Sequence, residues 1–134
     1  MKIGFIGLGN VGGKLASSLL RNKFDLTVRD LDKNLTDKFK NKGSKIANSA
    51  KELAEQTDLI ITCLPSPEIC ADVMESKDGV IHGLSKDKIW LEMSTTDESE
   101  VKRLGKLVSN KEAIPLDGPV SGGCHRAETG NISI

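Results

Sequence analysis

The amino-acid sequence predicts an α/β fold in which helices cover both faces of a mostly parallel sheet, the doubly wound arrangement. Apolar runs of strand length alternate with amphipathic helical segments along the whole chain. A glycine-rich turn at residues 7–12 joins the first apolar run to the first helical segment, and an acid, Asp30, ends the second run. Together these observations are typical of the first strand-helix-strand unit of a Rossmann domain.

The first half of the chain contains predicted strands at residues 2–6, 26–30, 45–47 and 58–65. The first and fourth are apolar without polar alternation, as in a parallel strand that is covered on both faces. The helices between these strands begin near residue 10, at residue 32 and at residue 49. In the first helix Val11, Leu15 and Leu19 form an apolar stripe at four-residue spacing. The third helix begins with a capping box that runs from Ser49 to Glu52.

The second half of the chain continues the alternation. We expect a helix at residues 69–74, an irregular connection at residues 79–84, strands at residues 88–93 and 113–116, and a helix between those two strands. Ile132 and Ile134 alternate like the start of a further strand. Six strands alternating with helices give one domain, in which the strand order is expected to reverse between the first and the fourth strand.

The turn Gly7-Leu8-Gly9-Asn10-Val11-Gly12 carries the binding chemistry. Gly7 permits a tight reversal, Gly9 lets a pyrophosphate approach the backbone, and Gly12 lets the helix pack close to the strand. The N-terminus of the helix adds unpaired N–H groups and about half a positive charge. The alternative is that three glycines simply form a turn in a generic α/β protein. The strand before the turn, the helix after it and the acid beyond favour a dinucleotide site.

Asp30 indicates which dinucleotide is bound. A carboxylate at the end of the second strand can accept hydrogen bonds from both hydroxyls of an adenosine ribose, and it repels the 2′-phosphate of NADP. An NADP site usually has a small residue followed by arginine, whereas here Leu31 follows the acid. We therefore predict NAD as the cofactor. Arg29 precedes the acid and could reach a phosphate, so NADP or dual use is the less favoured alternative.

The composition excludes several other classes of function. Lysine plus arginine and aspartate plus glutamate both number 19, so the formal net charge is zero and gives no electrostatic case for nucleic acid or a membrane surface. Three phenylalanines and one tryptophan offer no stacking platform for bases. The three cysteines show no CxxC spacing and neither histidine lies at ligand spacing from them, so we expect reduced thiols and no metal.

The chain length of 134 residues suits one domain with a core of its own. Met1 leads directly into the first strand without a recognisable targeting segment, and no apolar run approaches the ~20 residues of a membrane span. We therefore predict a cytoplasmic protein that does not span a membrane.

Two loops that follow predicted strands offer further contacts. Leu64, Pro65 and Pro67 would form a rigid wall beside the ligand, although prolines also simply end strands. Thr95 or Thr96 would act as the N-cap of the next helix, or its hydroxyl would face the nicotinamide half of the ligand, and the two roles are compatible.

A third loop contains the consecutive small residues Ser121, Gly122 and Gly123. Their N–H groups could form a concavity that binds the carboxylate of a substrate. An isolated glycine loop is more often just a turn, so this loop alone does not identify a site.

With these residues identified, the whole chain resembles the β-hydroxyacid dehydrogenase family, of which 3-hydroxyisobutyrate dehydrogenase is a typical member and 6-phosphogluconate dehydrogenase a more distant one. The resemblance rests on the glycine turn, the Leu64-Pro65 pair, the Ser-Thr-Thr run at residues 94–96 and the Asp-Gly-Pro-Val-Ser-Gly-Gly run at residues 117–123. The last run is close to the substrate-side signature of the family and is the most specific of the four.

The resemblance implies an oxidoreductase that acts on the CH–OH group of a short β-hydroxy acid or reduces the matching semialdehyde. It places Leu64, Pro65 and Thr95 on the cofactor and assigns Ser121, Gly122 and Gly123 to the substrate carboxylate. A non-catalytic dinucleotide-binding module is the alternative. A methyltransferase is disfavoured, because the tight glycine spacing suits a pyrophosphate.

The chain departs from the family pattern in small ways and in one large way. Val11 replaces the usual methionine, Ile69 replaces a polar cofactor contact, and Gly118 replaces an alanine. The family places its catalytic lysine in a second, all-α domain, and no lysine here matches that motif, so we expect that lysine beyond Ile134. We therefore expect residues 1–134 to be an NAD(P)-binding domain truncated before its last strand, inactive alone, from a protein that forms homo-oligomers.

Overall fold

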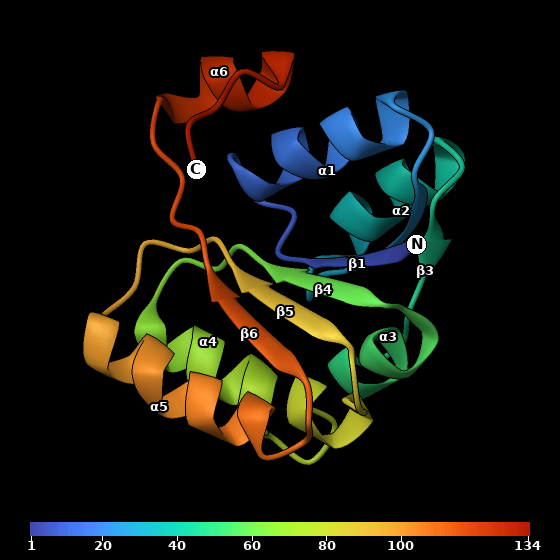
Figure 1. Ribbon diagram of the computed structural model, residues 1–134. Coiled ribbons are helices and arrows are strands. Elements are labelled where there is room, and N and C mark those ends of the chain that lie inside the picture. Colours follow the sequence, from blue (N-terminus) through green and yellow to red (C-terminus); the bar gives the residue numbers. More distant parts are fainter.

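The computed structural model describes residues 1–134, and its centre is one six-stranded sheet (Figure 1). The strands are β1 (Lys2–Ile6), β2 (Asp25–Arg29), β3 (Lys45–Ile46), β4 (Leu59–Thr62), β5 (Ile89–Glu92) and β6 (Ile114–Asp117). Their order is β3-β2-β1-β4-β5-β6, and every neighbouring pair is parallel. The order reverses between β1 and β4, so the predicted doubly wound fold is confirmed.

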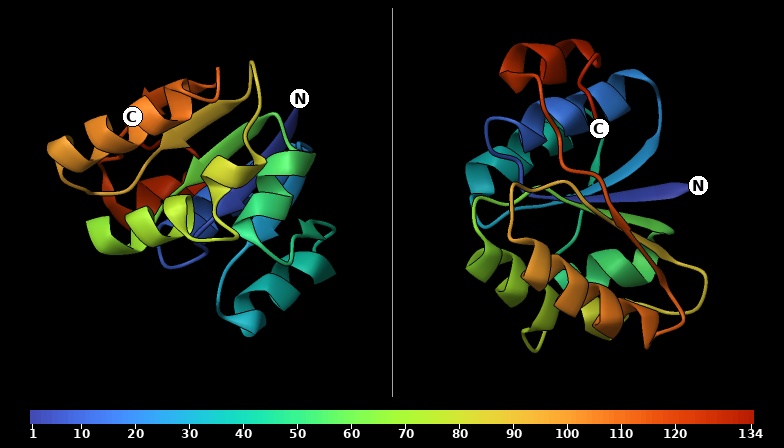
Figure 2. Two further views of the ribbon diagram at one scale, coloured as in Figure 1. Left: turned by 90° about the horizontal axis from the view of Figure 1, so that it is seen from below. Right: turned by 60° about the vertical axis from the view of Figure 1, so that its left-hand side comes forward.

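Helices cover both faces of the sheet. They are α1 (Gly12–Arg21), α2 (Lys33–Asn41), α3 (Ala50–Gln56), α4 (Pro67–Glu75), the 3₁₀ helix η1 (Val80–Gly83), α5 (Glu98–Ser109) and α6 (Gly123–Thr129). Figure 1 shows α1, α2 and α6 on one face and α3, α4 and α5 on the other, and the right-hand view of Figure 2 shows the same three layers. No helix combines the length and the apolar run that a bilayer span requires.

Each face of the sheet has its own apolar core. The core under α3, α4 and α5 includes Leu53, Ile60, Met74, Trp90 and Leu104. The core under α1 and α2 includes Phe5, Leu15, Val28, Phe39 and Ile61. The neighbouring residues Ile60 and Ile61 of β4 thus point into opposite cores, which explains why this strand is apolar without alternation.

Side-chain hydrogen bonds begin the helices close to the predicted positions. The Asp32 carboxylate accepts a hydrogen bond from the Asn34 N–H at 2.9 Å at the start of α2. The capping box of α3 forms on one side, where Ser49 Oγ accepts from the Glu52 N–H at 3.0 Å. On its other side the Glu52 carboxylate accepts from the Asn48 N–H at 2.8 Å, one residue earlier than the motif predicts.

In the second half of the chain one local prediction was wrong and one was confirmed. The N-cap residue of α5 is Asp97, so neither Thr95 nor Thr96 caps this helix. In α4 the residues that reach the core are Cys70 and Met74, four apart, while Ile69 is 42% exposed. The helix predicted at residues 69–74 is therefore confirmed as part of α4, with Ile69 outside the core.

The C-terminal residues contain a helix that the sequence analysis did not assign. In α6 only Ala127 is buried, so the sequence has no apolar stripe that would predict the helix. The strand expected at residues 132–134 is limited to one antiparallel bridge between Ser133 and Ser121. These residues pack against α1, and the Lys14 ammonium pairs with the Glu128 carboxylate at 3.3 Å.

The partly buried Lys88 ties the end of α3 to β5. Its ammonium donates hydrogen bonds to the backbone oxygens of Ala54, Glu55 and Thr57. Burial lowers the pKa of Lys88 below its ordinary value, and the negative charges of Asp58 and Glu55 oppose that shift. The three carbonyl groups at the end of α3 thus receive their hydrogen bonds from one side chain.

We expect Lys88→Met to lower the free energy of unfolding by about 1.5–3 kcal/mol, because partly buried carbonyl groups lose a charged donor. Urea unfolding measures the change. Lys86→Met is the matched control, since Lys86 is exposed, and we expect its effect to stay within about 0.5 kcal/mol. Equal losses in the two variants would contradict the role of Lys88.

Candidate functional site

A crevice of about 790 Å³ opens at the carboxyl ends of the strands. Residues directly after β1, β2, β4 and β5 line it, across the point where the strand order reverses. Ligands of doubly wound folds bind at this point. The predicted cofactor residues that line the crevice are Gly7, Gly9, Asn10, Val11, Gly12, Asp30, Leu64, Pro65 and Thr95.

The three glycines of the turn meet three different steric conditions. Gly7 has a φ of +97°, and a Cβ there would lie 2.2 Å from the carbonyl oxygen of Cys63. A Cβ on Gly12 would lie 2.0 Å from the carbonyl oxygen of Gly7. A Cβ on Gly9 would meet no atom within 4 Å. The fold therefore requires glycine at the first and third positions, whereas the second leaves open space on the crevice.

The N-terminus of α1 presents free backbone donors to the crevice. The N–H groups of Gly9, Asn10, Val11 and Gly12 donate to no acceptor within the protein. The first intrahelical bonds begin only with the N–H of Gly13, which donates to the Gly9 oxygen at 2.8 Å. Four unpaired N–H groups at the positive end of a helix dipole form a surface that attracts an anion.

The Asp30 carboxylate is fixed at the edge of the crevice by the backbone. Its Oδ2 accepts a hydrogen bond from the Leu8 N–H at 2.7 Å, and its Oδ1 accepts from the Asp32 N–H at 2.8 Å. This explains the place of Leu8, whose side chain is buried and does not line the crevice. Each carboxylate oxygen retains a lone pair for a further donor.

The neighbours of Asp30 differ in charge and exposure. Arg29 lines the crevice, and its guanidinium donates a hydrogen bond to the backbone oxygen of Asp30. Leu31 also lines the crevice and is 89% exposed. No other arginine and no lysine line the crevice, so Arg29 is the one cationic side chain on its walls.

Glu92, at the end of β5, is a buried acid that the sequence analysis did not single out. It lies behind the wall of the crevice that faces away from Asp30, on the side of β4 and β5. Its Oε1 accepts a hydrogen bond from the Ser94 N–H at 2.6 Å, and the Ser94 hydroxyl accepts from the Leu64 N–H at 2.7 Å. One carboxylate thus connects the loops after β4 and β5. The signal in the sequence is an acid inside an apolar strand that is covered on both faces.

The loop before α6 brings only part of the predicted substrate site to the crevice. Gly123 lines the crevice, whereas Ser121 and Gly122 are not among its lining residues. The Ser121 N–H donates to the Ser133 oxygen at 2.9 Å, so it is not free to bind an anion. The assignment of these three residues to a substrate stays a prediction.

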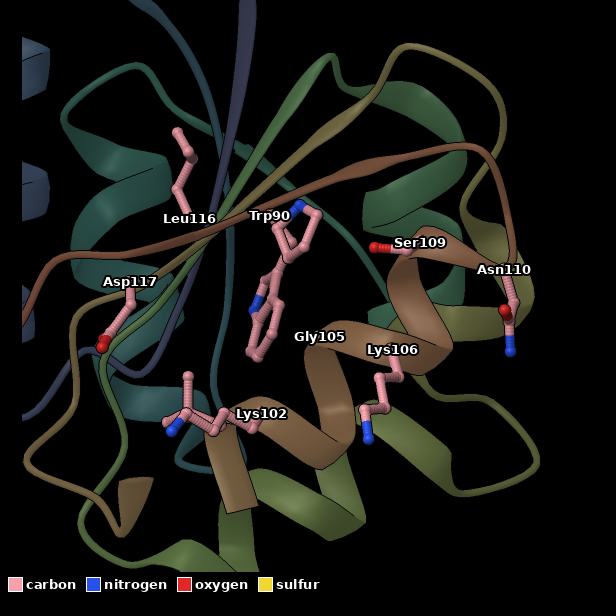
Figure 3. A pocket seen from close by; sticks show the side chains of 10 residues that line it. Trp90, Lys102, Gly105, Lys106, Ser109, Asn110, Leu116 and Asp117 are labelled. Atoms are coloured by element: carbon pink, nitrogen blue, oxygen red, sulfur yellow. The ribbon is translucent and has the colours of Figure 1, made fainter. Parts of the chain in front are cut away.

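A second cavity, of about 410 Å³, lies between α5 and the edge strand β6 (Figure 3). Trp90 from the sheet and Lys102 and Lys106 from the helix line it, and none of the predicted site residues does. Gly105 also lies there, where a Cβ would be 3.6 Å from the Pro115 Cβ, an ordinary contact.

No group of three or more histidine, cysteine, aspartate or glutamate side chains is arranged to hold a metal ion. The crevice is therefore the candidate site.

The thiol of Cys63 lines the crevice in its neutral form. Burial, together with the negative charge of Glu92, raises the pKa of Cys63 to about 11. The same two causes raise the pKa of the buried Cys70 further. Since the thiolate is the nucleophilic form of cysteine, neither thiol is a nucleophile at neutral pH.

Comparisons with known proteins find relatives over almost the whole chain. Residues 2–134 match the family described as the NAD binding domain of 6-phosphogluconate dehydrogenase. Among curated relatives, the mitochondrial 3-hydroxyisobutyrate dehydrogenases of Mus musculus and Drosophila melanogaster are 37% and 39% identical over 132 and 133 residues. These alignments cover 98% of the chain but 39% and 40% of the relatives. The chain thus spans less than half the length of the curated relatives it matches.

Solved structures give the same picture. A 3-hydroxyisobutyrate dehydrogenase from Salmonella typhimurium superposes with a TM-score of 0.90 at 26% identity, over 98% of this chain and 46% of that one. A protein named Psf3, in complex with NADP+ and 2-OPP, superposes with a TM-score of 0.92 at 24% identity, over 97% of this chain and 46% of that one. At this identity the second likeness shows the fold alone.

We expect iodoacetamide at pH 8 to alkylate Cys63 roughly a hundredfold more slowly than a thiol of ordinary pKa, because the thiolate fraction falls in that proportion. Timed alkylation followed by peptide mass spectrometry measures the rate. The chain unfolded in urea is the control, in which Cys63 reacts at the ordinary rate. An ordinary rate in the folded chain would contradict the neutral thiol.

Proposed function

Because this chain belongs to the family of the NAD-binding domain of 6-phosphogluconate dehydrogenase, we propose that it binds NAD in the crevice as the cofactor domain of an oxidoreductase. The proposed reaction is oxidation at the CH–OH group of a short, 3-hydroxyisobutyrate-like β-hydroxy acid, or reduction of the matching semialdehyde. One observation carries the cofactor assignment: free N–H groups at the N-terminus of α1 lie beside a carboxylate at the end of β2.

The pyrophosphate of the dinucleotide would be held by the turn after β1. The free N–H groups of Gly9, Asn10, Val11 and Gly12 supply the donors, and the dipole of α1 supplies about half a positive charge. The open space at Gly9 lets the phosphates reach the backbone. No basic side chain is needed for this contact.

The ribose next to adenine would be held by Asp30. Each oxygen of its carboxylate already accepts one hydrogen bond, from the Leu8 or the Asp32 N–H. The remaining lone pairs accept hydrogen bonds from the 2′- and 3′-hydroxyls. A 2′-phosphate in the same place would meet the negative charge of Asp30, with Arg29 as the one cation on the crevice. We therefore propose NAD as the preferred cofactor and NADP as the less favoured one.

The nicotinamide would then lie on the other half of the sheet. Dinucleotides cross from one half of a doubly wound sheet to the other, so the ring falls beside Leu64, Pro65 and Thr95 after β4 and β5. The chemistry that such a cofactor supplies when bound is hydride transfer.

The substrate side of the proposal rests on the resemblance to the family. Ser121, Gly122 and Gly123 would hold the substrate carboxylate, and of these Gly123 is on the crevice. The general base would be the lysine of the family, which has no counterpart in residues 1–134, so we expect this chain to bind cofactor without turnover. The names of the relatives favour an oxidoreductase over a non-catalytic module.

The remaining functional assignments stay predictions. The predicted partner is a small hydroxy acid, and neither nucleic acid nor a membrane is expected as a partner. The full-length protein is predicted to form a homo-oligomer. The sequence predicts the cytoplasm as the compartment, whereas the curated relatives are described as mitochondrial. These relatives therefore do not support the cytoplasmic assignment.

We expect Asp30→Asn to weaken NADH binding roughly tenfold, because charge-assisted hydrogen bonds to the ribose become neutral ones. NADPH binding is expected to strengthen, since the carboxylate no longer repels the 2′-phosphate. Calorimetric titration of the chain measures both affinities. Asp32→Asn is the matched control: Asp32 does not line the crevice, and asparagine also caps a helix. Unchanged affinities in Asp30→Asn would refute the role of Asp30.

We expect Gly9→Ala to fold normally and to lose at least about tenfold in NADH affinity. The added methyl group meets no protein atom, but it occupies the approach of the pyrophosphate to the backbone. Gly105→Ala makes the same chemical change in α5, where the methyl group fits, and is expected to keep NADH affinity. Full NADH affinity in folded Gly9→Ala would show that the turn is not the phosphate site.

A further inference from the structure

Glu92 is the only charged residue of this chain that is buried, with 0% of its surface exposed. A buried charge is costly unless an opposite charge or a set of hydrogen bonds compensates it. The ion pairs of the protein join surface side chains, and none of them includes Glu92. The protein therefore provides this acid with no cation.

Three hydrogen-bond donors surround the Glu92 side chain instead. Oε2 accepts from Thr62 Oγ1 at 2.8 Å and from Cys70 Sγ at 2.9 Å, and Oε1 accepts from the Ser94 N–H at 2.6 Å. Trp90 Nε1 donates to Thr62 Oγ1 at 2.9 Å, so the single hydroxyl proton of Thr62 is free to point at Glu92. Because each partner is a donor, this geometry suits the negatively charged carboxylate.

The Glu92 carboxylate lies directly behind the wall of the crevice. It accepts a hydrogen bond from the N–H of Ser94, and Ser94 lines the crevice together with Met93 and Thr95. In the proposed complex this is the half that receives the nicotinamide. A charge in this buried position acts on the ring through protein rather than through water, so it is weakly screened.

We propose that the Glu92 carboxylate makes the crevice favour the oxidised dinucleotide, whose nicotinamide ring is a cation, over the reduced one, whose ring is neutral. The two forms share every other charged group, so an anion behind the ring discriminates between them by the ring charge. A site with this preference holds the form of the cofactor that accepts a hydride. The inference rests on the proposed function, because it requires the nicotinamide to lie beside Ser94.

The test is calorimetric titration of the wild-type chain and of Glu92→Gln with NAD+, NADH and ADP-ribose, which lacks the nicotinamide ring. We expect wild type to bind NAD+ at least as tightly as NADH. In Glu92→Gln the ratio of the two affinities is expected to shift toward NADH by roughly fifteenfold, as Coulomb's law gives for the loss of a unit charge about 10 Å away at an effective dielectric constant of about 20. The affinity for ADP-ribose is expected to stay the same.

Thr62→Val separates the charge from the shape of the wall. It removes the hydrogen bonds that Thr62 Oγ1 makes with Glu92 and with Trp90 Nε1 but leaves the carboxylate in place, so we expect NAD+ and NADH to weaken alike, with their ratio unchanged. A shift in ratio as large as that of Glu92→Gln would overturn the proposal, because wall geometry would then explain it.

The remaining outcomes also decide the question. An unchanged ratio in folded Glu92→Gln overturns the proposal. If Glu92→Gln does not fold, the wild-type chain still tests the proposal, since tighter binding of NADH than of NAD+ contradicts the claimed preference. Failure of all three ligands to bind the folded wild-type chain overturns the proposed function as well, whereas binding without the expected ratio overturns only this inference.

Discussion

The close approach of α1 to the end of β1 is the constraint on which the rest of the structure depends. A Cβ on Gly12 would lie 2.0 Å from the Gly7 oxygen, and a Cβ on Gly7 would lie 2.2 Å from the Cys63 oxygen after β4. Only glycine, which has no Cβ, can therefore occupy these two positions, where α1, β1 and β4 come close together. This contact puts the N-terminus of α1 at the point where the strand order reverses, and it leaves the N–H groups there without partners.

The charges around the crevice follow from this arrangement. Backbone N–H groups and the dipole of α1 can neutralise a pyrophosphate, so the side chains are left to select what is attached at either end. Asp30 is held by backbone N–H groups on the β2 side, and Glu92 is buried behind the β5 side. In the proposed complex the Asp30 carboxylate accepts hydrogen bonds from the ribose, and the Glu92 carboxylate interacts with the charge of the nicotinamide ring. Arg29 is the single cationic side chain on the walls.

The sequence predicts those features whose information lies in neighbouring residues, such as the alternation of strands and helices, the glycine turn and the acid after β2. It does not predict features that depend on contacts between distant segments. The hydrogen bonds of Glu92 come from Thr62, Cys70 and Ser94 on different elements, and no spacing rule relates these positions. Likewise, α6 buries one residue and depends on contacts with α1, and the Ser121 N–H pairs with Ser133, so the predicted anion concavity loses a donor.

The most direct test of the central claim is a calorimetric titration of the unmodified chain with NADH and, separately, with NADPH. The geometry of the turn and of Asp30 predicts saturable one-to-one binding of NADH and at least about tenfold weaker binding of NADPH. Equal or tighter binding of NADPH would contradict the assignment of Asp30, and no binding of either dinucleotide to the folded chain would contradict the crevice as a dinucleotide site.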